Sequence, residues 1–115
     1  MLPNVTIDVG HNHIAAHVIA KEKKKKKITL IYNSYKDKDY EEVLKILKPI
    51  ISKIIIMPLD DKRIVEKNSL LEIIKQLNII NEESIKIEEN EEYLVFGSFL
   101  VVEKFLTLIG FNDKS

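Results

Sequence analysis

Short runs rich in isoleucine, valine and leucine alternate along the chain with segments of helical period, and this alternation constrains the fold most. The runs that predict strands are residues 4–9, 28–32, 52–59, 84–89 and 92–96. Strands separated by helical segments pair in parallel, because a parallel neighbour is reached only through a crossover connection. We therefore predict a Rossmann-like α/β domain, with a mostly parallel sheet of about five strands and helices on both faces.

The first strand and the helix after it have clear apolar patterns. Residues 4–9 are almost continuously apolar, which predicts a strand covered on both faces. In the segment that follows, one helix face is predicted to consist of Ile14, Ala15, Val18 and Ile19.

Three more helices are predicted, over residues 38–50, 68–77 and 99–110. In the first of them Asp39 is a candidate N-cap and Pro49 marks the end. The second has Asn68 or Ser69 as its cap, and Gly110 caps the C-terminus of the third.

The composition is that of an ordinary globular domain and excludes several classes of function. With 115 residues, of which 45% are hydrophobic and 31% charged, the chain can form one domain, residues 1–115, with its own core. Eighteen basic and eighteen acidic side chains cancel, so no overall field attracts nucleic acid or membranes. The absence of cysteine excludes disulfides and thiolate metal sites. The sequence shows no signal peptide or spanning segment, and we expect a cytoplasmic protein.

The run "KEKKKKK" at residues 21–27 raises a nucleic-acid hypothesis, because successive lysines can hold phosphates. The run contains no aromatic residue or arginine, and it lies between a predicted helix and a predicted strand. A solvated loop is the favoured interpretation, and we predict no nucleic-acid partner.

Four polar segments follow the predicted strands, namely "DVGHN", "NSYKDKD", "PLDDKR" and "GSF". In open parallel sheets, ligands bind at this carboxyl edge. Asp8 can accept a hydrogen bond from a ribose hydroxyl, His11 can donate to an anionic group, and Asn12 can cap the following helix. Ser98 either caps its own helix or, with the free N–H groups of the first turn, holds a carboxylate or phosphate. Ordinary turns with nothing bound are the alternative.

The histidines raise a metal hypothesis as well. His13 and His17 are four residues apart and share a helix face, close in sequence to His11 and Asp8. The glutamate that accompanies zinc-binding helices of this kind is missing, and no cysteine or fourth clustered ligand follows. We therefore predict no metal site and expect His17 at the surface or half-buried.

Taken in order, the polar segments resemble the C-terminal domain of the folylpolyglutamate synthase/dihydrofolate synthase family, within the wider Mur ligase group. "TIDVGHNHIAA" is similar to the family's Asp-x-Ala-His-Asn-Pro-x-Ala-Ala, and "SYKDKDYEEVL" to its Lys-Asp-Lys-Asp loop. "PLDDKR" corresponds to a stretch that usually holds an arginine, and "YLVFGSFLVVEKFL" to Val-x-Gly-Ser-Phe/Leu-x-x-Val. The resemblance covers residues 4–110. The chain departs from it at His13, where the family has proline, at Leu100, and in a short connection before the last strand.

The resemblance implies a reaction and a set of site residues. ATP phosphorylates the carboxylate of a pteroate or folate, and the amine of L-glutamate attacks the acyl phosphate. By this resemblance His11 is the catalytic residue, near the phosphates and the incoming glutamate, and Asp8 contacts the ribose. The implied nucleotide-binding set is Asp8, His11, Asn12 and Arg63, and the implied glutamate-binding set is His11, Ser98 and Lys36.

The ATP-binding machinery of such an enzyme is not in this sequence. No G-x-x-x-x-G-K-[ST] motif occurs, and the chain has only three glycines. We therefore predict the C-terminal, glutamate-ligase domain of a larger enzyme, with the absent N-terminal ATPase domain as its partner and ATP, L-glutamate and dihydropteroate or folate as small-molecule substrates.

The resemblance also sets expectations for the fragment on its own. ATP and Mg²⁺ act in the full-length enzyme, with Mg²⁺ held mainly by the missing domain, and the fragment binds no cofactor tightly. The fragment is expected to be a catalytically inactive monomer. The alternative is a stand-alone α/β module that binds a nucleotide or a metal without catalysis.

Overall fold

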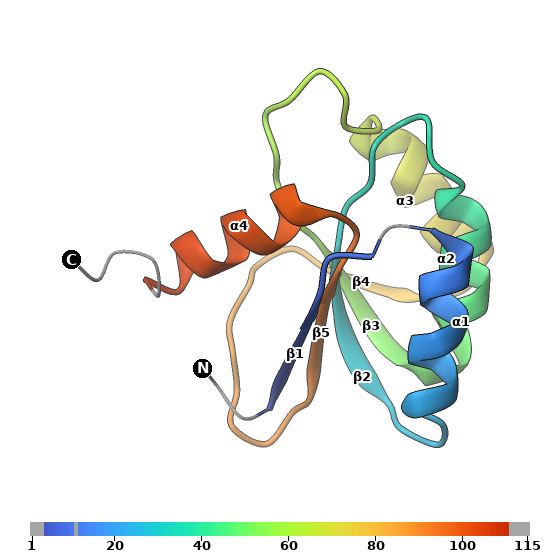
Figure 1. Ribbon diagram of the computed structural model, residues 1–115, viewed down its shortest axis with the longest axis vertical. Helices are drawn as coiled ribbons and strands as arrows, with labels where there is room; N and C mark the ends of the chain where they lie inside the picture. Colours follow the sequence, from blue (N-terminus) through green and yellow to red (C-terminus); the bar gives the residue numbers. More distant parts are fainter. Residues whose placement is uncertain (1–3, 11, 111–115) are drawn as a thin grey trace.

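The computed structural model describes residues 4–10 and 12–110, and these residues form five strands and four α-helices (Figure 1). The strands are β1 Val5–Asp8, β2 Ile28–Tyr32, β3 Ile51–Ile56, β4 Ile80–Glu82 and β5 Tyr93–Phe96. The helices are α1 His13–Glu22, α2 Tyr40–Leu47, α3 Lys67–Gln76 and α4 Phe99–Leu108, with a 3₁₀ turn at Lys48–Ile50. The order of elements confirms the predicted alternation of strands and helices.

All strand pairs of the sheet are parallel, and the strand order is β1-β5-β2-β3-β4. From β1 to β4 the chain advances across the sheet in one direction, so right-handed crossovers place α1, α2 and α3 on the same face. The chain then returns to insert β5 between β1 and β2, and α4 covers the opposite face (Figure 1). The predicted Rossmann-like fold with helices on both faces is confirmed.

The two strands at the middle of the sheet, β5 and β2, are buried along their whole length on both faces, as their largely apolar sequences predict. Leu30 and Tyr32 face the layer under α1, α2 and α3, whereas Ile31 between them faces the layer under α4. All three side chains are fully buried. Because successive side chains in a strand point to opposite faces, a run that is apolar at nearly every position fits a strand covered on both sides.

The predicted strand at residues 84–89 is wrong. The fourth strand is β4, three residues long and paired with Lys53–Ile55 of β3, and it begins soon after Asn78 turns the chain with a φ of 58°. The alternating Ile85 and Ile87 belong instead to the irregular connection from β4 to β5, where they pack against the core layer under α4. Ile85 and Ile87 alternate with polar residues because this connection packs two apolar side chains against the core. The alternation does not mark one face of a strand.

The first strand and helix are packed differently from the prediction. β1 is an edge strand whose residues after Val5 are only half-buried, so it is not covered on both faces. On α1 the buried side chains are Ala16 and Ile19, while Ile14 and Val18 are 64% and 53% exposed. Because alanine side chains are small, α1 can lie close to the sheet through its alanines. The buried face of α1 is therefore next to the face that Ile14 and Val18 predict.

One helix start also differs from the prediction. α3 begins at Lys67, with Glu66 at the N-cap position and no side-chain cap, so neither Asn68 nor Ser69 caps it. At the other end of the chain α4 ends as predicted, with Gly110 in a left-handed conformation at a φ of 79° just after the last turn.

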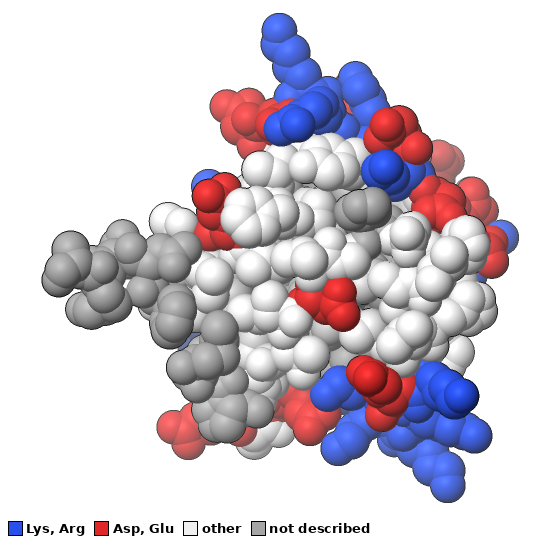
Figure 2. Space-filling view, viewed as in Figure 1, with Lys and Arg blue, Asp and Glu red and all other residues white. Residues whose placement is uncertain are grey.

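The lysine run lies far from the carboxyl edge of the sheet. Lys24 to Lys27 are exposed in the loop that joins α1 to β2, and Figure 2 shows the basic side chains gathered at the lower right, where Figure 1 shows this loop. Lys26 contacts Glu92 at 3.4 Å and Lys27 donates to the carbonyl of Pro49. Within the described part of the chain, no helix has the length and apolarity needed to cross a membrane.

Candidate functional site

The carboxyl ends of β1, β5 and β2 lie side by side, and the chain leaves them toward different faces of the sheet. After β1 the chain enters α1 on one face, whereas after β5 it enters α4 on the other (Figure 1). Loops that diverge in this way from neighbouring parallel strands open a crevice where ligands bind in α/β proteins. The fold therefore brings the predicted "DVGHN", "GSF" and "NSYKDKD" segments to one edge.

The turn after β1 holds Asp8 in a fixed orientation. The N–H of Gly10 donates to Asp8 Oδ1 at 2.7 Å, and the carbonyl of Gly10 accepts from the N–H of Gly97 at 3.1 Å. A Cβ at position 10 would lie 2.6 Å from the Cβ of Ala15 and 2.9 Å from Asp8 Oδ1. The close approach of the Ala15 and Asp8 side chains to Gly10 thus needs glycine at this position.

Both predicted caps at this edge are present. The side-chain oxygen of Asn12 accepts from the N–H of Ala15 at 2.9 Å and starts α1. The hydroxyl of Ser98 accepts from the N–H of Val101 at 3.4 Å and starts α4, and Ser98 is 1% exposed. Two capped helix N-termini therefore lie at the edge of the sheet, where N–H groups favour anionic ligands.

Two aromatic residues close the carboxyl ends of β2 and β5 and belong to the buried core under α1, α2 and α3. The rings of Tyr32 and Phe96, at the ends of β2 and β5, stack with centroids 6.3 Å apart and an interplanar angle of 14°. Both side chains are fully buried, and burial raises the pKa of the Tyr32 phenol far above its ordinary value. Tyr32 therefore stays neutral at physiological pH.

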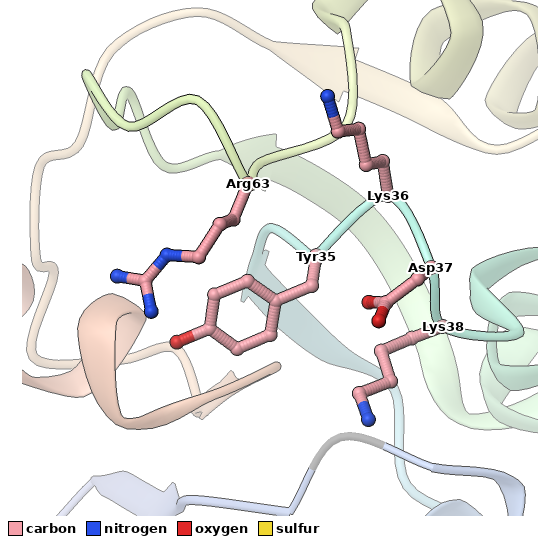
Figure 3. A pocket seen from close by; sticks show the side chains of 5 residues that line it. All are labelled: Tyr35, Lys36, Asp37, Lys38 and Arg63. Carbon is pink, nitrogen blue, oxygen red and sulfur yellow. The ribbon is translucent and has the colours of Figure 1, made fainter.

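The loops after β2 and β3 are joined and form an open basic pocket at the surface. The N–H of Lys36 donates to the carbonyl of Arg63 at 2.8 Å, and Tyr35 forms an antiparallel bridge with Ile64. A pocket of about 430 Å³ lies here, lined by Tyr35, Lys36, Asp37, Lys38 and Arg63 (Figure 3). The guanidinium of Arg63 lies over the ring of Tyr35, 5.3 Å from its centroid. Three cations line this pocket against one carboxylate.

Arg63 is held by Asp61 as well as by Tyr35. The guanidinium donates from Nε to Asp61 Oδ1 at 3.0 Å and from Nη2 to Asp61 Oδ2 at 2.8 Å, a bidentate arrangement. This hydrogen bonding from Arg63, with a further one from its backbone N–H, holds the pKa of the Asp61 carboxyl well below its usual range. Arg63 is thus preoriented at the rim of the pocket.

The Asp61 carboxyl should remain ionised at about pH 3, below the ordinary carboxyl pKa of about 4. Its folded-state pKa is lowered, so any stabilisation by the pair is complete above the unfolded-state pKa and disappears as the pH falls through the folded-state value. Carboxyl ¹³C shifts followed through an acid titration measure this, and Arg63→Ala should return the Asp61 titration to the ordinary range. A wild-type midpoint near 4 would contradict the bidentate geometry.

His13 and Asp39 connect the first loop with the basic pocket. His13 Nδ1 lies 2.7 Å from Asp39 Oδ2, although the two residues are 26 positions apart in sequence. Asp39 occupies the predicted N-cap position of α2, but its side chain makes no cap hydrogen bond. Pairing with His13 therefore replaces the predicted capping role of the Asp39 carboxylate.

The structure places most of the predicted site residues at this edge. Asp8, Asn12 and Ser98 lie on the loops around β1 and β5, and Lys36 and Arg63 share the basic pocket. His11 lies outside the described residues, and His17 is exposed on α1. In the described ranges, no group of three or more His, Cys, Asp or Glu side chains is arranged to hold a metal ion.

Sequence reasoning did not single out Tyr35 and Lys38, which line the basic pocket, or Asp61, which holds Arg63 at its rim. Tyr35 directly precedes the Lys-Asp-Lys-Asp segment, and Asp61 stands two positions before Arg63. An aromatic residue beside a basic loop and an acid two residues before an arginine are weak signals. Only the joined loops of the folded chain give them a role, because they bring Tyr35 under Arg63.

Comparisons with known proteins identify the relatives of this fold. No protein-family model matches the chain, and no curated protein matches it. Among solved structures, folylpolyglutamate synthetase of Helicobacter pylori matches with 43% identity and a TM-score of 0.88, covering 97% of this chain and 30% of that one. E. coli FolC in complex with ADP matches with 24% identity and a TM-score of 0.79, covering 99% of this chain and 30% of that one. The bifunctional folylpolyglutamate synthase/dihydrofolate synthase of Yersinia pestis, with AMPPNP and Mn, has 19% identity and a TM-score of 0.77, over 94% and 29%.

The fold and its polar carboxyl edge define a Rossmann-like α/β domain of the kind that forms one part of a longer ligase chain. The chain belongs to the folylpolyglutamate synthase family and has the fold of the C-terminal domain of those enzymes. It spans about 30% of the length of the solved relatives that it matches.

Proposed function

We propose that residues 1–115 are the C-terminal domain of an ATP-dependent ligase that adds L-glutamate to dihydropteroate or folate through an acyl phosphate. The observation that carries this proposal is the 43% identity, over 97% of the chain, with the Helicobacter pylori synthetase. Solved relatives contain ADP, AMPPNP with Mn, or AMPPNP and Mn with L-glutamate. These ligands, observed in those proteins, support a nucleotide and a glutamate as substrates here.

The nucleotide side of the site is assigned to the loop after β1. The N–H of Gly10 binds one oxygen of Asp8, and in this proposal the Asp8 carboxylate accepts hydrogen bonds from the ribose hydroxyls. His11 is assigned to the phosphates and the incoming glutamate by the family resemblance, and Asn12 supports it by starting α1. Arg63 is the weaker assignment, because its guanidinium is already bound by Asp61.

The glutamate side is assigned to the start of α4 and the basic pocket. Ser98 carries a hydroxyl at the N-terminus of α4, where backbone N–H groups favour a carboxylate. Lys36 supplies a positive charge from the loop after β2. A substrate with two carboxylates needs donors and cations on more than one side, and these two loops provide both.

In the proposed reaction, the nitrogen of glutamate forms a bond to the acyl carbon while the bond from that carbon to the phosphate oxygen breaks. Phosphate leaves with the bonding electron pair, and the amine loses a proton. The residues of this chain would orient the amine and offset negative charge, which accounts for much of the acceleration in reactions of this type. Mg²⁺ would neutralise phosphate charge and is assigned to the ATPase domain.

Glutamate-dependent ADP production tests the proposal. The 115-residue chain alone should show none, because acyl-phosphate formation needs the ATPase domain, whereas the full-length enzyme should show it. In the full-length enzyme His11→Ala should lower the ligation rate about 100-fold or more with the fold retained. His17→Ala is the matched control and should leave the rate unchanged, since His17 is exposed on α1.

Three results would contradict the proposal. Glutamate-dependent ADP production by this chain alone would show that it carries its own ATP site. Equal ligation rates for the His11→Ala and wild-type enzymes would remove His11 from the site. Tight binding of a metal or nucleotide without any ligation by the full-length protein would favour the stand-alone binding module.

A further inference from the structure

The contact between His13 and Asp39 joins two segments that belong to different parts of the site. His13 is the first residue of α1, next to Asn12, and Asp39 ends the loop that carries Lys36 and Lys38. The two side chains meet at 2.7 Å although they are 50% and 41% exposed. Exposed pairs contribute little to stability, so the consequence of this contact lies in where it places the Asp39 charge.

The charges around the basic pocket are unevenly compensated. Arg63 is opposed by the bidentate carboxylate of Asp61. Lys36 and Lys38 have no ion-pair partner among the residues that the structure describes. Figure 3 shows the two amino groups pointing in different directions from the loop, with Lys38 half-buried. These two lysines are the cations available to an anionic ligand.

Lys38 stands in sequence between two carboxylates, Asp37, which lines the basic pocket, and Asp39, which lies at the start of α2. The Asp39 side chain could cap α2 or pair with Lys38, and it does neither, because His13 holds it. A carboxylate released at this position would offset the charge of Lys38, since opposite charges at about 4 Å attract by roughly 1 kcal/mol even in water.

We propose that His13 is a positioning residue that binds the Asp39 carboxylate and thereby keeps Lys36 and Lys38 available to an anionic substrate. The inference rests on the proposed function only in taking the ligand of this pocket to be the carboxylate of the amino-acid substrate. His13 stands where the resembling family has proline, which has no side-chain donor, so this restraint on the lysine loop is a feature of this chain.

The test is an amide-resolved NMR titration of the 115-residue chain with millimolar L-glutamate, following Tyr35 to Lys38. Four variants are compared with the wild type: His13→Ala, His13→Gln, Asp39→Asn and the double variant His13→Ala/Asp39→Asn. His13→Ala should weaken binding about fivefold. His13→Gln should bind like the wild type, because an amide N–H can still donate to the carboxylate.

The double variant separates this role from a purely structural one. If His13 only keeps the Asp39 charge away from the lysines, Asp39→Asn should restore glutamate binding in the His13→Ala background to that of Asp39→Asn alone. A double variant as weak as His13→Ala would overturn the proposal, because His13 would then act by itself or through the fold. Unchanged urea midpoints in all variants exclude loss of structure as the cause.

Failure here is distinguishable from failure of the proposed function. No response of Tyr35 to Lys38 to L-glutamate in the wild type would overturn the role of His13, because the pocket would then not bind the anion. Ligation by the full-length enzyme is measured separately as ADP production. Ligation can persist when the basic pocket does not respond to L-glutamate, and ligation can be absent when the pocket binds L-glutamate.

Discussion

Replacing Gly97 with alanine should lower the free energy of unfolding by about 3 kcal/mol or more. The φ of Gly97 is 136°, a region that side chains rarely adopt, and an added Cβ would lie 2.1 Å from the carbonyl oxygen of Asn33. That carbonyl cannot easily move, because the Asn33 side chain donates to the carbonyl of Met57 at 2.6 Å and accepts from the N–H of Ser34. Urea unfolding measures the loss as a fall in the midpoint.

Gly110 provides the matched control for this substitution. It also has a positive φ, 79°, but no atom lies within 4 Å of the position that a Cβ would take. Gly110→Ala should therefore cost only the conformational penalty, about 1 kcal/mol. If Gly97→Ala were no more destabilising than Gly110→Ala, the result would contradict the close contact between Gly97, which follows β5, and Asn33 in the loop after β2.

Replacing Phe105 with alanine should cost about 3–5 kcal/mol of the free energy of unfolding. Phe105 is fully buried in the layer under α4, where it packs with Val5, Ile31 and Val95. α4 is the one helix on this face among the described residues, so no neighbouring helix can close over the cavity. Chemical unfolding followed by circular dichroism measures the difference.

Leu108→Ala on the same helix is the control for Phe105→Ala. Leu108 is 51% exposed, so its truncation removes little buried surface and should cost less than about 1 kcal/mol. Comparable losses for the two substitutions would mean that α4 does not pack on the sheet through Phe105.

The fold was predictable from the sequence where the pattern is local. β2 has the predicted bounds, because a five-residue run in which only Thr29 is polar, and in which every residue is buried, fits a strand covered on both faces. The strand near residue 84 was not predictable, because Ile85 and Ile87 have the alternation of a strand but pack as a crossing segment. Whether a segment of alternating apolar residues joins a sheet depends on whether a strand lies beside it to pair with. The sequence of the segment itself does not determine this.

The same distinction applies to the site. The caps Asn12 and Ser98 were predicted because each acts on the N–H three residues ahead. The contact of His13 with Asp39 spans 26 positions, and the buried face of α1 depends on how closely Ala15 approaches Gly10. These features arise from packing between elements, and no single segment encodes them.

The most direct measurement is an amide-resolved NMR titration of this chain with millimolar Mg·ATP and L-glutamate, and separately with Zn²⁺. A domain that supplies half of a ligase site should show shifts centred on Asp8 to Asn12 and on Gly97 and Ser98 with the nucleotide and glutamate. Binding should be weak, because in the proposed enzyme the ATPase domain would provide the other contacts. Tight Zn²⁺ binding with shifts confined to the histidines, and no shifts with the nucleotide and glutamate, would contradict a ligase half-site. That result would identify a metal site.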